Sequence, residues 1–585
     1  MSDFSTVLIE DSRIAKITDK TVFGVQSSAS QSTYQQFNAT SASNSSIIWS
    51  VQIPSENILI DRHVLLQTDL TFTVNIAGVP ADEVAFQYGL TDALQAFPIQ
   101  SLFTTQQLTI NNVSTSVNLQ DVLPMVLRMT PNRRLSEHNC LIPSFVDQSY
   151  AVYKDGVGSS NNPLSAFNNS SFDNDFEPRG AFSVNIEVSH YIDGIGEPDD
   201  SVVSTSVNDT WKIVISGTFT EPFLALAPFL SQKSENDAGL IGINNMAITL
   251  NVDSTCKRLF STANTYTETD ASGVTHQRSW IQSIQLGSEA QPNGFINTRL
   301  LFNFLSLQPD QYARISSKNV VPYMDLPRYL SNSTSSGSVL PGGKTTLTSN
   351  SIQLSLVPDL LLICARVPMT MQNWAYSNSF LAIDHINVNF NNASGLLASS
   401  STADLYNLSR RNGSAQKFSE FRGYVQVNDT SDPPTGNVRK VPTVGSLLVI
   451  NPVYDLNLPA FLSSSSLGQF QFQFQLSVTN YFPYSVTPEL VVVAVNSGVF
   501  STVAGTSMIQ AGLLTKESVL EAKSHGQSVP KIDSSQYERL IGGQLCNRGM
   551  SNVRHLIKEF KPSHKENMGG VLSAGHRSKL SKLVS

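Results

Sequence analysis

The stretch GQFQFQFQLSVTN (468–480) decides the fold class, because apolar and polar residues alternate strictly along it. Its apolar residues are Phe470, Phe472, Phe474, Leu476 and Val478. Its polar residues are Gln469, Gln471, Gln473, Gln475, Ser477 and Thr479. A period of two is typical of a β-strand with one face on a core. Strands that face only water usually carry charge, so we expect another surface to cover the uncharged face. The alternative is that this face meets solvent or a loop of its own domain.

The same alternation recurs along the chain and predicts an all-β protein. The further strand candidates are residues 47–53, 63–76, 210–219, 246–252, 346–357, 385–390 and 489–495. Clusters of Gly, Pro, Asn and Ser separate them. Many strands with long polar loops favour sandwiches or barrels over βαβ units.

A short pattern occurs twice and predicts a duplicated unit. In both copies a strand ends in Asn-Asn-x-Ser, at 111–114 and again at 391–394, an offset of 280 residues. Helical patterns follow at 118–129 and 402–413, the second with Thr402 as the expected N-cap and Gly at its end. A weaker echo pairs Trp49 with Trp280. We interpret this as one sandwich unit at about 45–255 and again at about 275–505, with chance similarity as the alternative.

The composition favours a protein whose outer faces become interfaces. Charged residues make up only 14% of the 585 residues, against a typical value of about 25%, and interface cores are depleted in charge. A secreted adhesin or lectin is the alternative on composition alone. The cysteines, at 140, 256, 364 and 546, are too scattered for a disulfide framework, and the first residues lack a signal-peptide pattern. We therefore expect a reducing compartment.

Motifs for catalysis or cofactor binding are weak. The stretch SVLPGGKTT (338–346) lacks the first glycine of a phosphate loop and precedes a strand pattern, so a surface loop is the better interpretation. The acidic stretch at 190–200 fits no EF-hand spacing, and the histidines fit no zinc motif. We expect no catalytic residues, no cofactor, no metal and no membrane span.

The charge of the chain is strongly segregated. Residues 544–585 carry a net charge of +6, whereas the whole chain carries −8. The basic residues of this tail are Arg548, Arg554, Lys558, Lys561, Lys565, Arg577, Lys579 and Lys582. An acidic body with a basic tail favours contacts of the tail with nucleic acid, or with the body of a neighbouring subunit.

Several phrases, taken in order, resemble the double jelly-roll major capsid proteins of the virophage, polinton-like and adenovirus-type lineage of DNA viruses. They include WSVQIPSENILIDRHVLLQTDLTFTVN (49–75), SIQLSLVPDLLLICARV (351–367), GSLLVINPVYDLNL (445–458) and the opening stretch. The resemblance covers most of residues 45–520. It implies an all-β fold of two tandem eight-stranded jelly rolls with a few short helices and a basic C-terminal tail.

The resemblance also implies a function and a set of partners. We expect a structural protein, not an enzyme, that forms pseudo-hexameric homotrimers tiling an icosahedral virion shell. Penton and minor capsid proteins, a packaging ATPase and a maturation protease are the implied partners, with synthesis in the host cell cytoplasm. We expect an N-terminal arm at 1–44, a first roll at 45–260, a second roll at 261–510 and a tail at 511–585. The rival interpretation is a secreted carbohydrate-binding or carbohydrate-active β-sandwich protein.

Within the tail, ERLIGGQL (538–545) resembles the Leu-x-Gly-Gly sites cut by maturation proteases of adenovirus type. Leu540, Gly542 and Gly543 would be the recognised positions, with the cut before Gln544. A flexible linker is the alternative. The basic residues of the tail would then contact packaged DNA or act as an assembly arm.

Overall fold

The computed structural model forms two compact units, 1–28 with 526–585 and 29–525. It describes residues 7–9, 23–25, 31–131, 184–190, 202–204, 210–223, 239–306 and 318–512, apart from 56–57, 78–83, 89–91, 263–264, 272, 274, 333–336, 376–377, 429–437, 459–461, 483 and 504. In the first unit, β1 (Val7–Ile9) pairs with β2 (Phe23–Val25). All other described elements belong to the second unit.

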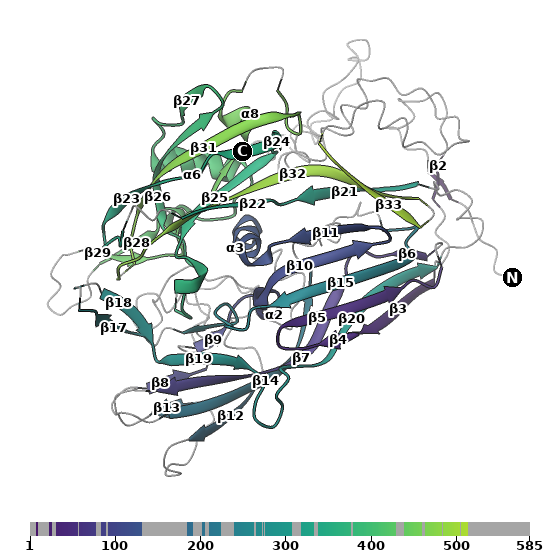
Figure 1. Cartoon of the computed structure of the whole chain (residues 1–585), viewed down its shortest axis with the longest axis horizontal. Helices are drawn as coiled ribbons and strands as arrows, with labels where there is room; N and C mark the ends of the chain where they lie inside the picture. The colour runs from purple at the N-terminus through teal and green to yellow at the C-terminus, as the bar shows by residue number, and fades with distance from the viewer. Residues whose placement is uncertain are drawn as a thin grey trace, which may run out of the picture. The chain divides into compact units, whose positions relative to one another are not determined.

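Two antiparallel sheets form the first roll (Figure 1). One sheet has the order β11-β10-β15-β5-β4, with β4 (Ser41–Ala42), β5 (Ser46–Gln52), β10 (Phe103–Ile110), β11 (Val113–Val117) and β15 (Asn245–Val252). The other has the order β12-β14-β7-β20-β3, with β3 (Gln31–Asn38), β7 (Leu65–Ala77), β12 (Asn185–His190), β14 (Thr210–Pro222) and β20 (Phe295–Ser306). In addition, β6 (Ile58–Ile60) pairs with β20, and β19 (Ile281–Leu286) pairs with β7.

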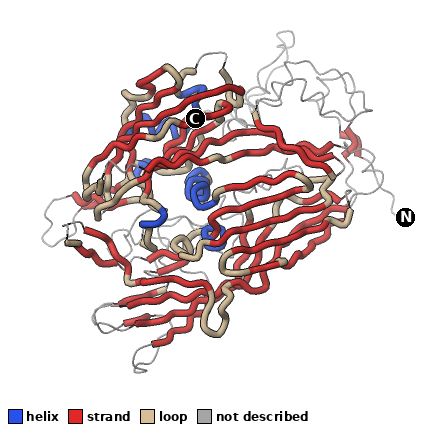
Figure 2. The backbone as a smooth tube through the Cα atoms, in the orientation of Figure 1, coloured by secondary structure: helices blue, strands red, loops and turns tan. Residues whose placement is uncertain are grey.

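The second roll repeats this arrangement (Figure 2). One sheet has the order β23-β31-β26-β27 with β24 on β31, where β23 is Lys344–Thr348, β24 Ile352–Leu356, β26 Ala382–Phe390, β27 Ala393–Leu396 and β31 Leu467–Thr479. The other has the order β21-β32-β25-β30 with β22 and β33 on β32, where β21 is Lys318–Asp325, β22 Arg328–Asn332, β25 Leu360–Arg366, β30 Leu448–Ile450, β32 Glu489–Val503 and β33 Thr506–Ala511.

Smaller elements complete the unit. The paired strands are β8 (Val84–Gln87) with β13 (Val202–Ser204), β9 (Asp92–Leu94) with β16 (Phe260–Thr262), β17 (Thr265–Thr269) with β18 (Thr275–Ser279), and β28 (Tyr424–Asn428) with β29 (Val438–Pro442). The helices are α2 (Pro98–Leu102), α3 (Leu119–Met129), η4 (Met369–Met371), α6 (Thr402–Arg411), α7 (Phe418–Phe421) and α8 (Pro452–Asp455).

The strand orders match over their central runs, so the chain is a double jelly roll, as predicted. The run β14-β7-β20 of the first roll corresponds to β30-β25-β32 of the second, and β11-β10-β15 corresponds to β27-β26-β31. The strands predicted from alternation are all present, except that the candidate at 346–357 is split into β23 and β24.

Alternation builds the core as expected. In β31 the side chains of Phe472, Phe474 and Leu476 are fully buried, and β5 contributes Trp49 in the same way to the first roll. Burial of one such side chain contributes roughly 1.5–3 kcal/mol. The residues between them point outward, which fixes the register, because a slip by one residue would expose the whole apolar set.

The duplicated Asn-Asn-x-Ser pattern has a structural cause. Asn111 and Asn391 each open a two-residue hairpin with a left-handed backbone, at φ 53° and 48°, a conformation that asparagine tolerates well. Each side chain also satisfies a neighbouring strand, since Oδ1 of Asn111 accepts from the amide of Asn244 and Oδ1 of Asn391 accepts from that of Gln471. The pattern therefore marks equivalent corners of the two rolls.

Two local predictions are wrong. The N-cap of α6 is Ser401, which forms a capping box with Asp404, and not Thr402. The echo of Trp49 and Trp280 is not a structural equivalence, because Trp49 lies in β5 whereas Trp280 precedes β19, which pairs with β7 of the same roll.

The pairing of β19 and β20 with β7 bears on the division of the chain. Both strands complete the sheet of the first roll, although the predicted division at residue 260 assigns them to the second. We therefore propose that the division falls between Ser306 and Lys318, the ends of β20 and β21.

Candidate assembly interface

Helix α3 lies between the two rolls (Figure 1) and is buried on nearly all sides. Its Asp121 is 1% exposed and accepts hydrogen bonds from two arginines of the second roll, Arg328 on β22 and Arg366 on β25. The Nε of Arg366 donates in turn to Oε1 of Glu489 on β32, at 2.8 Å. These four residues form an ion cluster that joins the rolls, with Asp121, Arg366 and Glu489 buried and Arg328 half-buried.

The cluster is electrostatically matched. Burial would lower the pKa of Arg366, but Asp121, Cys364 and Glu489 raise it above its ordinary value. The pKa of nearby Arg258 shifts in the opposite direction, because burial and the charge of Arg366 lower it to about 9. The buried charges therefore depend on one another, which is typical of groups held far from water.

The last turn of α3 holds the second roll through Arg128. Its Nη1 donates to the carbonyl oxygen of Pro124 at 2.9 Å, and its Nη2 donates to the carbonyl oxygens of Asn378 and Val444. Its guanidinium lies 3.8 Å from the centroid of the Phe380 ring. Both ends of α3 thus contact the second roll.

A buried carboxylate on β14 fixes the short helix α2, which packs against α3. Glu221 accepts hydrogen bonds from the amides of Ile99 and Gln100, both at 2.8 Å. Burial raises the pKa of Glu221 to about 8, although the two amides act to lower it. Buried Glu221 therefore holds α2 in place, and α2 in turn supports the position of α3.

The outer face of the β31 sheet is polar, exposed and almost free of charge. Gln469, Gln471 and Gln475 are exposed, and Gln473 is half-buried and accepts from Asn389 at 3.3 Å. Neighbouring strands add Thr346, Thr348, Gln353, Ser355 and Asn387 to this face. The only Asp, Glu, Lys or Arg residues in these strands are Lys344 and Asp384, which pair with each other at 3.4 Å. The stretch 468–480 therefore has one buried apolar face and one outward polar face, as its alternation predicts.

The equivalent sheet of the first roll is even less charged. None of its strands β4, β5, β10, β11 and β15 contains Asp, Glu, Lys or Arg. Its outward residues include Ile48, Ser50, Gln107 and Asn251, all exposed. Both rolls therefore carry one uncharged polar sheet face, called here the polar faces.

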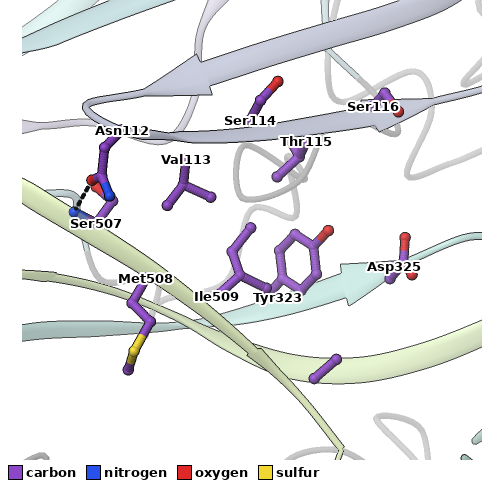
Figure 3. A pocket seen from close by; sticks show the side chains of 11 residues that line it. Asn112, Val113, Ser114, Thr115, Ser116, Tyr323, Asp325, Ser507, Met508 and Ile509 are labelled. Carbon is purple, nitrogen blue, oxygen red and sulfur yellow. Dashed lines mark hydrogen bonds between the residues drawn. The ribbon is translucent and has the colours of Figure 1, made fainter. Parts of the chain in front are cut away.

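A groove of about 640 Å³ lies between the edge strand β11 and strands β21 and β33 (Figure 3). Its lining residues are Asn112, Val113, Ser114, Thr115, Ser116, Tyr323, Asp325, Ser507, Met508, Ile509 and Ala511. Among the lining residues, the amide of Ser507 donates to Oδ1 of Asn112 at 2.7 Å. Burial raises the pKa of Tyr323 to about 12, helped by the nearby Asp325.

The predicted tail sites lie outside the described residues. This holds for Leu540, Gly542, Gly543 and Gln544 and for all eight basic residues from Arg548 to Lys582. The acidic stretch after His190 lies outside as well. Within the described ranges, no three His, Cys, Asp or Glu side chains gather into a metal-binding group. Over the same ranges, no helix has the length and apolarity to cross a membrane.

The ion cluster between the rolls was missed by sequence reasoning. One signal was present, because Arg366 closes the otherwise apolar run LLLICAR of β25, and a buried charge demands a partner. The partner Asp121 lies 245 residues away, and nothing in the sequence links the two.

The fold, with its two polar faces, is a double jelly roll, and comparisons with known proteins assign the chain to capsid proteins. The family model of the Sputnik virophage major capsid protein first domain matches residues 2–305, and that of the major capsid protein V20 C-terminal domain matches residues 326–498. The chain belongs to the family of virophage major capsid proteins. A putative capsid protein V20 of Sputnik virophage is 28% identical over an alignment of 558 residues, which covers 92% of this chain and 84% of the relative.

Solved structures share the fold. A chain of the Sputnik virophage structure matches with a TM-score of 0.70 at 24% identity, covering 92% of this chain and 98% of that one. The mavirus major capsid protein matches with a TM-score of 0.62 at 16% identity, covering 91% of this chain and 100% of that one. This chain is accordingly a structural component of a virion that assembles with itself into a capsid, and not an enzyme. The carbohydrate-binding alternative is not supported.

Proposed function

We propose that three copies of this chain form a pseudo-hexagonal capsomer, and that such capsomers tile an icosahedral shell. The observation that carries the proposal is the match of strand order between the two rolls of one chain. Three chains then supply six similar lobes around one axis, and a closed ring leaves no lobe with an unpaired side.

The polar faces are the surfaces that we assign to contacts between lobes. Burial of a charge without a partner is costly, whereas amides and hydroxyls can exchange hydrogen bonds with water for hydrogen bonds across an interface. A face without charge therefore tolerates both the free and the assembled state. The two polar faces fit this requirement, because the lone Lys344–Asp384 pair neutralises itself.

Size-exclusion chromatography with light scattering tests the trimer. We expect a particle of three times 63.7 kDa or larger, and pseudo-hexagonal outlines in negative-stain microscopy. A stable monomer at micromolar concentration would contradict the proposal.

A charge placed on a polar face tests its role. Gln471→Lys should leave the thermal stability of the chain unchanged, since the side chain is exposed, but should weaken assembly by burying an unpaired charge. The matched control is Gln426→Lys, an exposed position on β28. Equal assembly of both variants would argue against the polar face as a contact surface.

We further propose that the tail is processed and that it acts during assembly. A maturation protease would recognise Leu540, Gly542 and Gly543 and cut before Gln544, because a glycine pair allows an extended backbone in a narrow cleft. The basic residues after the cut would contact packaged DNA, or the acidic body of a neighbour. Penton and minor capsid proteins would complete the shell, and synthesis would take place in the host cytoplasm.

Two measurements test the tail. Intact-mass analysis of protein from virions should give a chain that ends at Gly543, and a full-length chain would contradict the processing. Binding of the tail to duplex DNA should fall steeply with salt, because phosphate contacts release counterions. Binding that does not change with salt would refute the DNA contact.

A further inference from the structure

Helix α6 is the counterpart of α3 in the second roll, but its outer face is open. Each helix follows the Asn-Asn hairpin of its roll, and Asp121 of α3 corresponds to Asp404 of α6 at an offset of 283 residues. In α3 nearly every residue is buried, whereas in α6 only Leu405 and Ser409 are. The face of α6 that points away from its own roll is therefore exposed.

The exposed face of α6 has the same charged residue types with which α3 contacts the second roll. Asp121 and Arg128, the two charged contacts of α3, correspond to Asp404 and Arg411, and both are exposed in α6. Each is satisfied locally in the single chain, Asp404 by the capping box with Ser401 and Arg411 by Asp455. Tyr454, which precedes Asp455 on α8, is 71% exposed. Tyrosine is enriched among the residues that dominate binding energy at interfaces.

We propose that the exposed face of α6, formed by Ala403, Asp404, Asn407, Arg410 and Arg411 with Tyr454, docks on the first roll of a second copy of this chain. The argument is one of symmetry and rests on the proposed trimer. In a ring of three chains, first and second rolls alternate around one axis. Each second roll then faces the first roll of the next copy in the way that each first roll faces the second roll of its own chain. The contact of α3 with the second roll is then repeated by α6 with that next copy.

The charges of the α6 face match those of α3 in type and position. The α6 face holds an acid at its first turn and two arginines at its last, a pattern that also stabilises the helix dipole. Within the same chain, α3 uses the same arrangement to bind carbonyl oxygens and guanidinium groups across a boundary between rolls. The α6 face thus repeats the charge pattern of the contact between α3 and the second roll.

A charge-insertion experiment tests the proposal. The variant Ala403→Glu adds an acid to the α6 face without altering the cap at Ser401 or the pair of Arg411 with Asp455, because the residues three and four positions on, Tyr406 and Asn407, carry no charge. Glutamate is also a good helix former. We expect an unchanged melting temperature and a concentration for half-assembly at least about 100-fold above that of the wild type, since the added carboxylate would be buried in the contact without a partner. The control Ala271→Glu, an exposed position between β17 and β18, should assemble as the wild type does.

A photo-crosslinking residue at position 407 supplies an independent measurement. In assembled protein we expect crosslinks between copies that map to residues 31–306. Crosslinks confined to residues 318–512 of the other copy, or normal assembly of the Ala403→Glu variant, would overturn the α6 contact while leaving the trimer intact. A wild-type chain that stays monomeric would instead overturn the trimer, and the α6 contact with it.

Discussion

Replacement of Asp121 tests how the two rolls are held together. Asp121→Asn keeps the shape of the side chain but removes the charge that Arg328 and Arg366 share. The two guanidinium groups are left near each other, with Glu489 as the remaining acid of the cluster. Removal of one partner from a buried ion pair typically costs about 3–5 kcal/mol. That is a large fraction of the roughly 5–15 kcal/mol by which folded proteins are stable.

Chemical denaturation of the wild type and the variant measures this cost. We expect the midpoint to fall, and hydrogen exchange to accelerate in α3 and β25 before it does in the cores of the rolls, because the boundary between the rolls loses its buried charge balance. The control is Glu268→Gln, which removes the exposed pair with Arg278 at 3.0 Å and should cost only a few tenths of a kcal/mol. A loss for Asp121→Asn below about 1 kcal/mol would refute the reasoning that this cluster joins the rolls.

Three further predictions concern burial and backbone. Because the folded-state pKa of Glu221 is raised to about 8 from 4.5, the folded chain holds a proton that the unfolded chain loses, so the free energy of unfolding should fall between about pH 4.5 and 8. The expected slope is about 1.4 kcal/mol per pH unit, and Glu221→Gln should flatten it in urea titrations. Gly445→Ala should destabilise the chain by more than about 3 kcal/mol, since a Cβ at φ 82° would lie 1.8 Å from the carbonyl oxygen of Phe380, whereas Gly395→Ala, in open space at φ 78°, should cost about 1 kcal/mol. Phe474→Ala should cost about 3–5 kcal/mol by calorimetry, because its side chain is fully buried, and a loss near 1 kcal/mol would show that the core refills the cavity.

Strand alternation made most of the fold predictable. The period of two in β31, β15 and β7 reports a core face directly, and the hairpin asparagines at 111 and 391 report a backbone requirement that few residues meet. What the sequence could not supply is pairing between distant segments. The resemblance of Trp280 to Trp49 misled because a local phrase says nothing about which strand lies beside it. For the same reason the expected division at residue 260 separates β20 from β7, the strand with which it pairs.

The candidate site was predictable only in character. The shortage of charge pointed correctly to outward faces of amides and hydroxyls. The ion cluster around Asp121 was not predictable, because its members come from four elements spread between residues 121 and 489. Helix α6 looked like α3 in sequence, yet only the structure separates the buried helix from the exposed one.

The burial of α3 between the rolls has a consequence for how a shell grows. Because one peptide chain carries both rolls, the α3 contact forms in a unimolecular step and is indifferent to dilution. In a ring of three chains, only the joints between chains would then depend on how much protein a cell has made. Early in synthesis, the contact within each chain would therefore already be complete, and only the contacts between chains would depend on encounters.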